Sequence, residues 1–167
     1  MTRSRTTHIQ LVCRGNICRS PMALAITRQF LHDAQLATRI ALSSAGIGAV
    51  QSGSRPDPRA IDALLRHGYH APRMRTRAVT LQDFERFDQI LAMDRSNLED
   101  LQSLCPSACQ HKLRLFLQGA AELSDQEIPD PYYGGMAGFE RVLQLCEDGA
   151  RALVARWRLA SPRAPGK

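Results

Sequence analysis

The stretch that decides the fold is Val12–Pro21, which reads V-C-R-G-N-I-C-R-S-P. It follows the short β-like run His8–Val12, and its last two residues, Ser20–Pro21, supply a favourable N-cap and a favourable first helical residue. Gly15 and Asn16 are residue types that tolerate a positive φ, which a tight loop around an anion needs. Because the free N–H groups and the dipole of a helix N-terminus favour negative charge, the stretch predicts an anion-binding loop between a strand and a helix.

Cys13 and Arg19 are the residues of this loop that carry chemistry. Cys13 ends the strand, in the positive field of the helix N-terminus and beside Arg19, where cysteine pKa values fall to roughly 3.5–7.5 instead of about 8.5. The planar guanidinium of Arg19 offers a fork that matches two phosphate oxygens. The loop is therefore expected to hold a reactive thiolate next to a bound oxyanion.

Outward from this loop, strand patterns and helix patterns alternate along the chain. Further strands are predicted over 38–43, 87–93 and 112–117. Helices are predicted over 20–36, 58–67, 95–104 and 139–159. Strands separated by helices imply an α/β fold, a single three-layer domain with a four-stranded parallel sheet and helices on both faces. Ligands of such sheets bind at the carboxyl ends of the strands, where the Val12–Pro21 loop is expected to lie.

The size and composition of the chain agree with one globular domain. The 167 residues, 44% hydrophobic and 23% charged, suffice for a single core within a domain spanning 1–167, with mobile ends at 1–7 and 161–167. No run approaches the roughly 18 apolar residues of a membrane span, and the N-terminus has no apolar segment typical of a secretory signal. Five scattered cysteines, an odd number, favour reduced thiols, so we expect a cytoplasmic location and no membrane insertion.

The net charge of +6 fits two kinds of anionic partner, a nucleic acid or a small anionic substrate. The first acidic residue is Asp33, which follows five arginines, and residues 151–167 contain no acid. The arginines are not interleaved with aromatic residues, which make up only 5% of the chain. Stacking platforms for bases are therefore scarce, and nucleic acid is not the expected partner.

The Val12–Pro21 loop resembles the signature of the low-molecular-weight protein tyrosine phosphatases, a cysteine, five residues and then Arg-Ser-Pro, with Gly-Asn and a second cysteine inside. The Asp-Pro-Tyr-Tyr string at Asp130–Tyr133 resembles the general-acid loop of the same family. Ser43–Gly46 resembles its Ser-Ala-Gly segment, and Phe87–Leu98 its third strand and following turn. The resemblance runs from about His8 to Trp157.

The resemblance implies a phosphatase that hydrolyses phosphotyrosine monoesters through a phosphocysteine intermediate, with Cys13 as nucleophile, Arg19 as phosphate ligand and Asp130 as general acid. Ser44 is expected to brace the loop through Asn16. No metal or other cofactor is expected, since Arg19 and the loop dipoles supply the positive field. The expected substrate contacts come from the loop and from the tyrosines beside Asp130: Arg14, Gly15, Asn16, Ile17, Cys18, Ser20, Tyr132 and Tyr133.

Three positions depart from the family pattern. Apolar Leu24 stands where an acid is frequent, a supporting histidine is replaced by Met74 or its neighbour Arg73, and a cleft aromatic is replaced near Val50. The departures leave the core chemistry in place and bear on rate and substrate choice. Arg14 either favours acidic substrates or points to solvent.

The substrate is expected to be a tyrosine-phosphorylated protein, with a bacterial tyrosine kinase as one candidate. Two other functions stay open. A thiol-dependent arsenate reductase would use further cysteines on a mobile segment, but none occurs between Cys18 and Cys105. A non-catalytic phosphoprotein-binding module would lack the nucleophile or the acid, but Cys13 and Asp130 are both present.

Asp94 is expected to cap a helix or tie loops together, and Cys105, Cys109 and Cys146 are expected to be inert.

Overall fold

The computed structural model describes residues 5–48, 52–120 and 126–160. Four parallel strands form one sheet with the order β2-β1-β3-β4. The strands are β1 (Thr7–Cys13), β2 (Ile40–Gly46), β3 (Gln89–Ala92) and β4 (Leu113–Leu115). The helices are α1 (Arg19–Asp33), α2 (Pro58–Arg66), α3 (Leu81–Arg86), α4 (Arg95–Leu104), the 3₁₀ helix η1 (Ser107–Lys112) and α5 (Met136–Ala160). The predicted parallel four-stranded α/β domain is confirmed.

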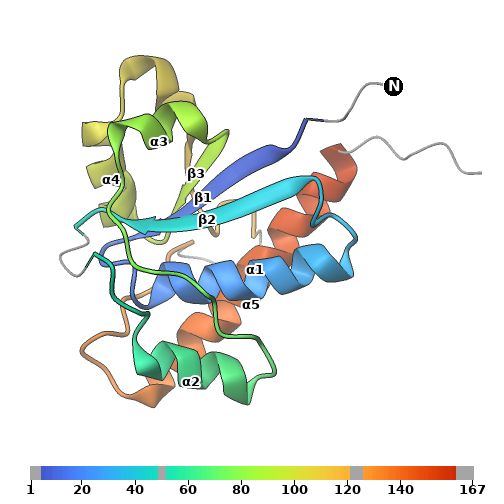
Figure 1. The fold of residues 1–167 in the computed structure, drawn as a ribbon, viewed down its shortest axis with the longest axis vertical. Coiled ribbons are helices and arrows are strands. Elements are labelled where there is room, and N and C mark those ends of the chain that lie inside the picture. Colours follow the sequence, from blue (N-terminus) through green and yellow to red (C-terminus); the bar gives the residue numbers. More distant parts are fainter. Residues whose placement is uncertain (1–4, 49–51, 121–125, 161–167) are drawn as a thin grey trace, which may run out of the picture.

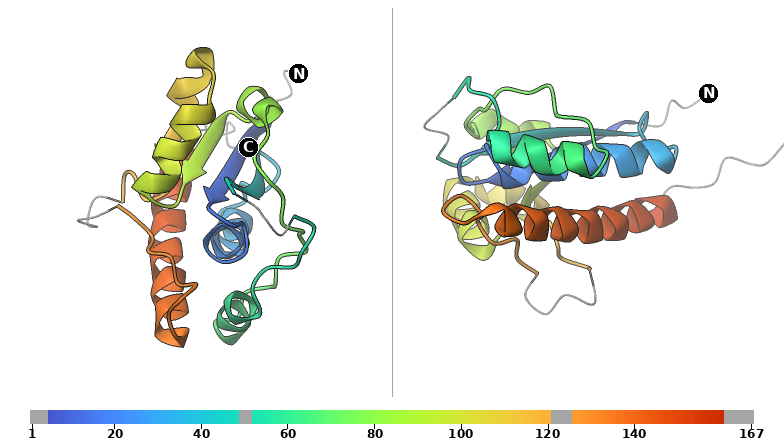
Figure 2. Two further views of the ribbon diagram at one scale, coloured as in Figure 1. Left: turned by 90° about the vertical axis from the view of Figure 1, so that its left-hand side faces the viewer. Right: turned by 90° about the horizontal axis from the view of Figure 1, so that it is seen from below.

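The sheet lies between two layers of helices (Figure 1). On one face, α1 and α5 run side by side, with α2 packed against both of them (Figure 2). A hydrophobic core between these helices and the sheet includes Met22, Ile26, Phe139 and Cys146, all fully buried. On the other face, α3 and α4 cover a smaller core around Phe84. The expected α5 core positions Val142, Leu145, Cys146, Leu153 and Trp157 are all buried.

The central strand β1 brings the loop after it to the middle of the carboxyl edge of the sheet. Cys13, the last residue of β1, lies opposite Gly46, the last residue of β2. The chain after β2 continues along the loop, because Ile47 N donates to Cys13 O at 3.0 Å and Gly48 N to Arg14 O at 2.9 Å. A Cβ atom on Gly46 would lie 2.8 Å from Arg14 O and 2.9 Å from Asn16 N. Only glycine allows this close approach, so β2 forms a wall against which the loop packs.

The structure corrects several local predictions. Helix α1 begins at Arg19, with Cys18 as N-cap residue, so the predicted N-cap role of Ser20 is wrong. The Ser20 hydroxyl contacts the loop instead of capping the helix. Helix α3 and η1 were not predicted, because both are only six residues long and short helices have weak periodicity. Strands β3 and β4 are shorter than expected.

The ends of the chain lie partly outside the described residues. Residues 1–4 and 161–167, which the sequence predicts to be mobile, belong to the segments that the structure does not describe. Thr7 already belongs to β1, one residue before the expected start of the strand. Within the described ranges, no helix combines the length and apolar character needed to cross a membrane.

Candidate active site

A pocket of about 310 Å³ opens at the carboxyl edge of the sheet, above the N-terminus of α1. The loop after β1 forms its floor, and the segment around Asp130 forms one wall. The lining includes nine of the expected residues and adds Gly48: Cys13, Arg14, Gly15, Ile17, Cys18, Arg19, Gly48, Asp130, Tyr132 and Tyr133. Asn16, Ser20 and Ser44 do not line the pocket; their side chains lie behind the loop and support it.

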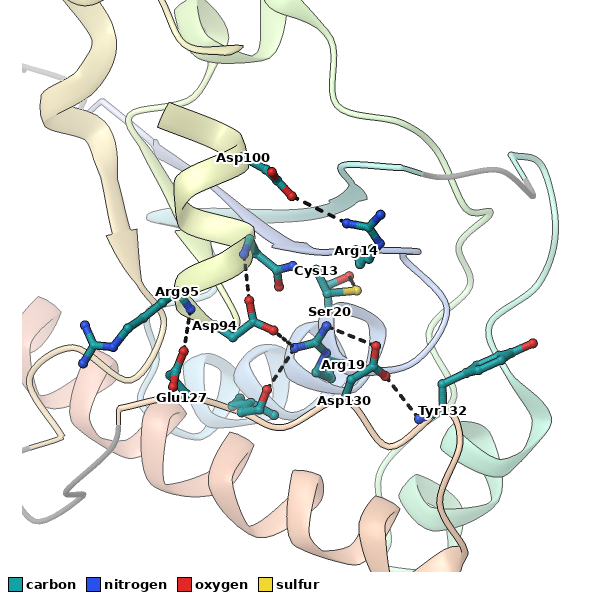
Figure 3. Close-up of polar contacts among 12 residues, drawn as sticks. Cys13, Arg14, Arg19, Ser20, Asp94, Arg95, Asp100, Glu127, Asp130 and Tyr132 are labelled. Carbon is teal, nitrogen blue, oxygen red and sulfur yellow. Dashed lines mark hydrogen bonds and ion pairs between the residues drawn. The ribbon is translucent and has the colours of Figure 1, made fainter. Parts of the chain in front are cut away.

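The thiol of Cys13 lies at the bottom of the pocket and has two polar neighbours. Its Sγ atom is 3.0 Å from the Ser20 hydroxyl (Figure 3). The sulfur also accepts a hydrogen bond from Asn16 N at 3.3 Å. Both neighbours can donate a hydrogen bond to a sulfur anion. The Cys13 side chain is therefore surrounded by groups suited to a thiolate.

Asn16 holds the loop in its curled conformation. It adopts a φ of 58°, as expected for a residue type that tolerates the left-handed region, whereas Gly15 does not have a positive φ. Its Nδ2 donates to Ser20 Oγ at 2.9 Å and to Ser44 Oγ at 2.7 Å, and its Oδ1 accepts from Arg77 N at 3.1 Å. The contact between Ser44 and Asn16 is the one that the sequence predicts. One buried amide thus joins the loop to β2 and to the segment before α3.

Arg19 is buried, and carboxylates on two separate segments face its guanidinium (Figure 3). Its Nη1 donates to Asp94 Oδ2 and, at 2.9 Å, to Ile128 O, while its Nη2 lies 3.5 Å from Asp130 Oδ2. Burial by itself lowers the pKa of Arg19, but the Cys13 sulfur and the two carboxylates outweigh it and raise this pKa above its ordinary value. The guanidinium therefore stays charged beside the Cys13 thiol.

Asp94 performs both tasks that the sequence left as alternatives. Its Oδ1 accepts from Asn97 N at 2.7 Å and so caps α4, while its Oδ2 bonds Arg19. The cap could be predicted from sequence, since Asp is a favoured N-cap residue. The contact with Arg19 could not, because it joins residues that are 75 positions apart.

Asp130 lies at the rim of the pocket, with its side chain about half exposed. Its Oδ1 accepts a hydrogen bond from Tyr132 N at 3.1 Å, a local turn that fixes the carboxylate above the loop. Tyr132 and Tyr133 extend the same wall, with ring centroids 4.9 Å apart in an edge-to-face arrangement. Tyr133 is 97% exposed, so one aromatic face is open to a substrate.

A second ion pair joins the phosphate loop to this wall, and sequence reasoning missed it. Asp57 is the N-cap residue of α2, its N–H donates to Ile17 O at 2.8 Å, and its carboxylate binds Arg59 through Nη2 at 2.8 Å. Arg59 also donates to Tyr132 O at 3.0 Å and lies over the Tyr132 ring. The Asp-Pro pair at the start of α2 predicts a helix cap but gives no signal of the contact with Tyr132.

Cys18 is buried beside this ion pair. Burial, the Asp57 carboxylate and the Cys13 sulfur raise the pKa of Cys18 well above its ordinary value. The hydrogen bond from Arg59 lowers the pKa of Asp57, and the Cys18 thiol contributes in the same direction. The two cysteines of the loop are thus in different electrostatic environments, and Cys18 stays a neutral thiol.

The departures from the family pattern have different structural outcomes. Arg14 is exposed and forms a 3.6 Å ion pair with Asp100 of α4. It therefore neither simply points to solvent nor stands unpaired, ready for an acidic substrate. Leu24 is buried in the core. Met74, and not Arg73, reaches the supporting network, because its sulfur accepts a hydrogen bond from Ser44 Oγ at 3.3 Å. Val50 lies outside the described residues.

Comparisons with known proteins agree with this geometry. The model of the family described as low molecular weight phosphotyrosine protein phosphatase matches residues 8–161. A curated relative with that name from Schizosaccharomyces pombe is 39% identical over 137 residues, which are 81% of this chain and 87% of the relative. Two solved structures are similar to the fold. That of a low molecular weight phosphotyrosine phosphatase from Vibrio cholerae O395 has a TM-score of 0.87 and 41% identity, and the match covers 93% of this chain and 99% of the other.

The second similar solved structure is that of Wzb from Vibrio vulnificus, in complex with benzylphosphonate. It has a TM-score of 0.78 and 27% identity, and the match covers 90% of this chain and 98% of the other. The family match spans both the phosphate loop and the Asp130 wall, and the relatives align over nearly their whole length. The chain therefore belongs to the low molecular weight phosphotyrosine protein phosphatase family and is a protein-tyrosine phosphatase.

Proposed function

We propose that the enzyme hydrolyses phosphotyrosine in two steps at Cys13, with Arg19 and Asp130 as the other catalytic residues. In the first step the Cys13 thiolate attacks phosphorus, so that an S–P bond forms as the bond to the tyrosine oxygen breaks. Asp130 gives its proton to the departing phenolate. In the second step Asp130 takes a proton from water, the water oxygen bonds phosphorus, and the S–P bond breaks to return the thiolate.

The observation that carries this proposal is the arrangement of three groups around one pocket. The Cys13 sulfur lies at its floor, the charged Arg19 guanidinium lies beside the sulfur, and the Asp130 carboxylate lies at the rim within 3.5 Å of Arg19. A nucleophile, an anion-binding fork and a proton donor on separate sides of one pocket match the needs of in-line phosphoryl transfer.

The Nη2 group of Arg19 can contact either Asp130 or a bound phosphate, but not both at the same time. In the structure its fork is directed at Asp94 and Asp130. When a phosphate group enters the loop, the Nη2 group turns from Asp130 to the phosphate oxygens, while Nη1 keeps its contacts with Asp94 and Ile128. The Asp130 carboxyl group is then released to face the leaving oxygen. Substrate binding thus couples the placement of the anion ligand to the placement of the acid.

Ser20 and Asn16 act on the thiolate from behind the loop. The Ser20 hydroxyl, 3.0 Å from Cys13 Sγ, donates to the sulfur anion when the S–P bond breaks in the second step. The Asn16 side chain does not bind substrate, because its amide is fully used in hydrogen bonds with Ser20, Ser44 and Arg77. The backbone N–H groups of the loop residues that line the pocket bind the phosphate oxygens.

The proposed substrates are tyrosine-phosphorylated proteins, with a bacterial tyrosine kinase as one candidate. The exposed rings of Tyr132 and Tyr133 support an aryl phosphate, because they offer an aromatic wall above the loop. Benzylphosphonate, the ligand in the Vibrio vulnificus Wzb structure, is likewise an aromatic group attached to a phosphorus acid. We propose a cytoplasmic location on the ground that all five cysteines are free thiols. We also propose that residues 1–167 act as a single phosphatase domain.

The two other functions have less support. A thiol-dependent arsenate reductase would use further cysteines on a mobile segment to pass the oxidation along, whereas Cys105, Cys109 and Cys146 do not line the pocket. Cys146 is fully buried, and burial raises its pKa well above the ordinary value. A binding module would not need an acid opposite the thiol.

The direct test measures phosphate release from three peptides of one sequence that carry phosphotyrosine, phosphoserine or phosphothreonine. We expect turnover of the phosphotyrosine peptide alone, and none with the Cys13→Ser variant. That variant should still bind vanadate, since Arg19 and the loop N–H groups remain. Turnover by Cys13→Ser, or equal turnover of the three peptides, would refute the proposal.

A further inference from the structure

A second pocket, of about 510 Å³, is formed by α2 and the segments that flank it. Its lining combines three arginines with a largely apolar floor: Arg55, Pro56, Ile61, Ala71, Pro72, Arg73, Met74 and Arg75. The three guanidinium groups come from both segments, one before α2 and one after it, so the fold brings them to one hollow. The chain after α2 is seen in Figure 1 as it returns from α2 toward α3.

The charge of this hollow is not neutralised within the described part of the chain. Arg55, Arg73 and Arg75 are exposed, and none of them forms an ion pair or a side-chain hydrogen bond with another described residue. The nearest acid in sequence, Asp57, is occupied by Arg59, which binds both of its carboxylate oxygens. By contrast, Arg14, Arg19, Arg59, Arg66, Arg77 and Arg151 all have acidic partners.

We propose that this pocket is a secondary site that binds an acidic segment of the phosphoprotein substrate, a few residues from its phosphotyrosine. The proposal rests on the protein-tyrosine phosphatase function at Cys13. Guanidinium groups bind carboxylates through paired hydrogen bonds, and the apolar floor accepts the methylene groups of Glu or Asp side chains. The lining contains no aromatic residue on which a nucleobase could stack, which disfavours a nucleic acid.

The position of the pocket suits a peptide that leaves the catalytic cleft. Arg55 is two residues before Asp57, whose N–H donates to Ile17 O at 2.8 Å, and Ile17 lines the catalytic pocket. At 3.8 Å between successive Cα atoms, the Arg55 and Ile17 backbones are separated by roughly 14 Å or less. About four extended residues span this length. A phosphotyrosine in the loop and acidic residues near Arg55 can therefore belong to one short segment.

The test compares phosphotyrosine peptides that carry three glutamates or three glutamines after a neutral spacer of about four residues, on either side of the phosphotyrosine. For the wild type we expect a KM about five- to tenfold lower for the glutamate peptide of one orientation, a preference that falls as salt is raised. The triple variant Arg55→Gln/Arg73→Gln/Arg75→Gln should lose this preference. Its kcat, and its activity on para-nitrophenyl phosphate, should stay at the wild-type level.

The matched control is Arg114→Gln/Arg141→Gln/Arg158→Gln, which removes the same charge from exposed arginines that do not line the pocket. It should keep the preference for the glutamate peptide. The pocket assignment is refuted if both triple variants lose the preference equally, or if wild type does not distinguish the peptides. It is also refuted if a single-stranded oligonucleotide competes better than an unphosphorylated glutamate peptide. Failure of the catalytic proposal is distinct, since wild type would then not release phosphate from any phosphotyrosine peptide.

Discussion

The guanidinium of Arg19 lies 3.5 Å from the carboxylate of Asp130, although the two residues are 111 positions apart in the chain. The side chain proposed to bind the phosphate thus lies directly against the proposed proton donor, and the same Arg19 side chain is anchored on its other side by Asp94. The directions in which the Arg19 guanidinium donates hydrogen bonds should therefore matter for activity as well as its positive charge.

Arg19→Lys should reduce kcat by about 10²–10³-fold, because an ammonium group cannot bond Asp94, Ile128 and a phosphate in the directions of the fork. Steady-state kinetics with para-nitrophenyl phosphate measures the effect. Arg151→Lys serves as control, since Arg151 forms only an exposed ion pair with Asp148 at 3.0 Å and does not line the catalytic pocket, and it should stay near wild-type activity. A near-normal kcat for Arg19→Lys would contradict the assigned role.

Asp130→Asn should slow the hydrolysis of substrates with poor leaving groups by roughly 10²–10⁴-fold, the usual range for general acid catalysis. The phenolates of acidic phenols leave without being protonated, so the hydrolysis of their aryl phosphates should be slowed less. A plot of log kcat/KM against the phenol pKa should therefore be steeper for the variant than for the wild type. Parallel lines would mean that Asp130 has only a structural role.

Peroxide should inactivate the enzyme through Cys13, and a thiol reductant should restore it. The Cys13 thiolate attacks peroxide to give a sulfenic acid and hydroxide, and the Cys18 thiol then displaces water to form a disulfide. Since the raised pKa of Cys18 keeps it protonated, Cys13 reacts first.

Cys18→Ser should be inactivated as fast as wild type but should recover less, because further oxidation of Cys13 is no longer intercepted. Peptide mapping after mild peroxide should identify a Cys13–Cys18 linkage. Complete recovery of Cys18→Ser would instead indicate that Cys18 only packs beneath the loop, where it is buried.

Gly46→Ala should destabilise the protein by about 1–3 kcal/mol, the usual range for overpacking. Its Cβ would lie 2.8 Å from Arg14 O and 2.9 Å from Asn16 N, both of them backbone atoms of the phosphate loop. Thermal unfolding measures the loss. Gly48→Ala is the matched control, because a Cβ there has no atom of the described residues within 4 Å. Equal melting temperatures for the two variants would refute the close packing of β2 on the loop.

Asp57→Asn should lower the melting temperature by several degrees near neutral pH while retaining the helix cap. The pKa of Asp57 is lowered in the folded protein, chiefly by Arg59, from an ordinary value of 3.8. Its contribution to stability is therefore complete above about pH 4 and is lost as the pH falls through the lowered pKa. The melting curves of variant and wild type should converge under acidic conditions, and a constant difference would contradict this account.

The local part of the site could be predicted from the sequence. The end of the strand, the loop and the start of the following helix are encoded by ten adjacent residues, whose φ preferences and helix-start signals act over short distances. The alternation of strands and helices likewise predicted the parallel sheet, since each strand must return through a crossover. The place of Asp130 came from resemblance, because a Pro-Asp-Pro turn alone is common on protein surfaces.

Contacts between distant segments were decided only by the tertiary structure. The bond of Arg19 to Asp94, the link from Asp57 through Arg59 to Tyr132, and the approach of Gly46 to the loop each depend on how the strands and helices pack. Even Ser20, correctly placed at the start of α1, serves Cys13 and Asn16 instead of the helix end. The sequence determined which groups carry charge and nucleophilicity. Which of them meet was decided by the fold, because hydrogen bonds and ion pairs act only within a few ångströms, and the chain brings such groups together only by folding.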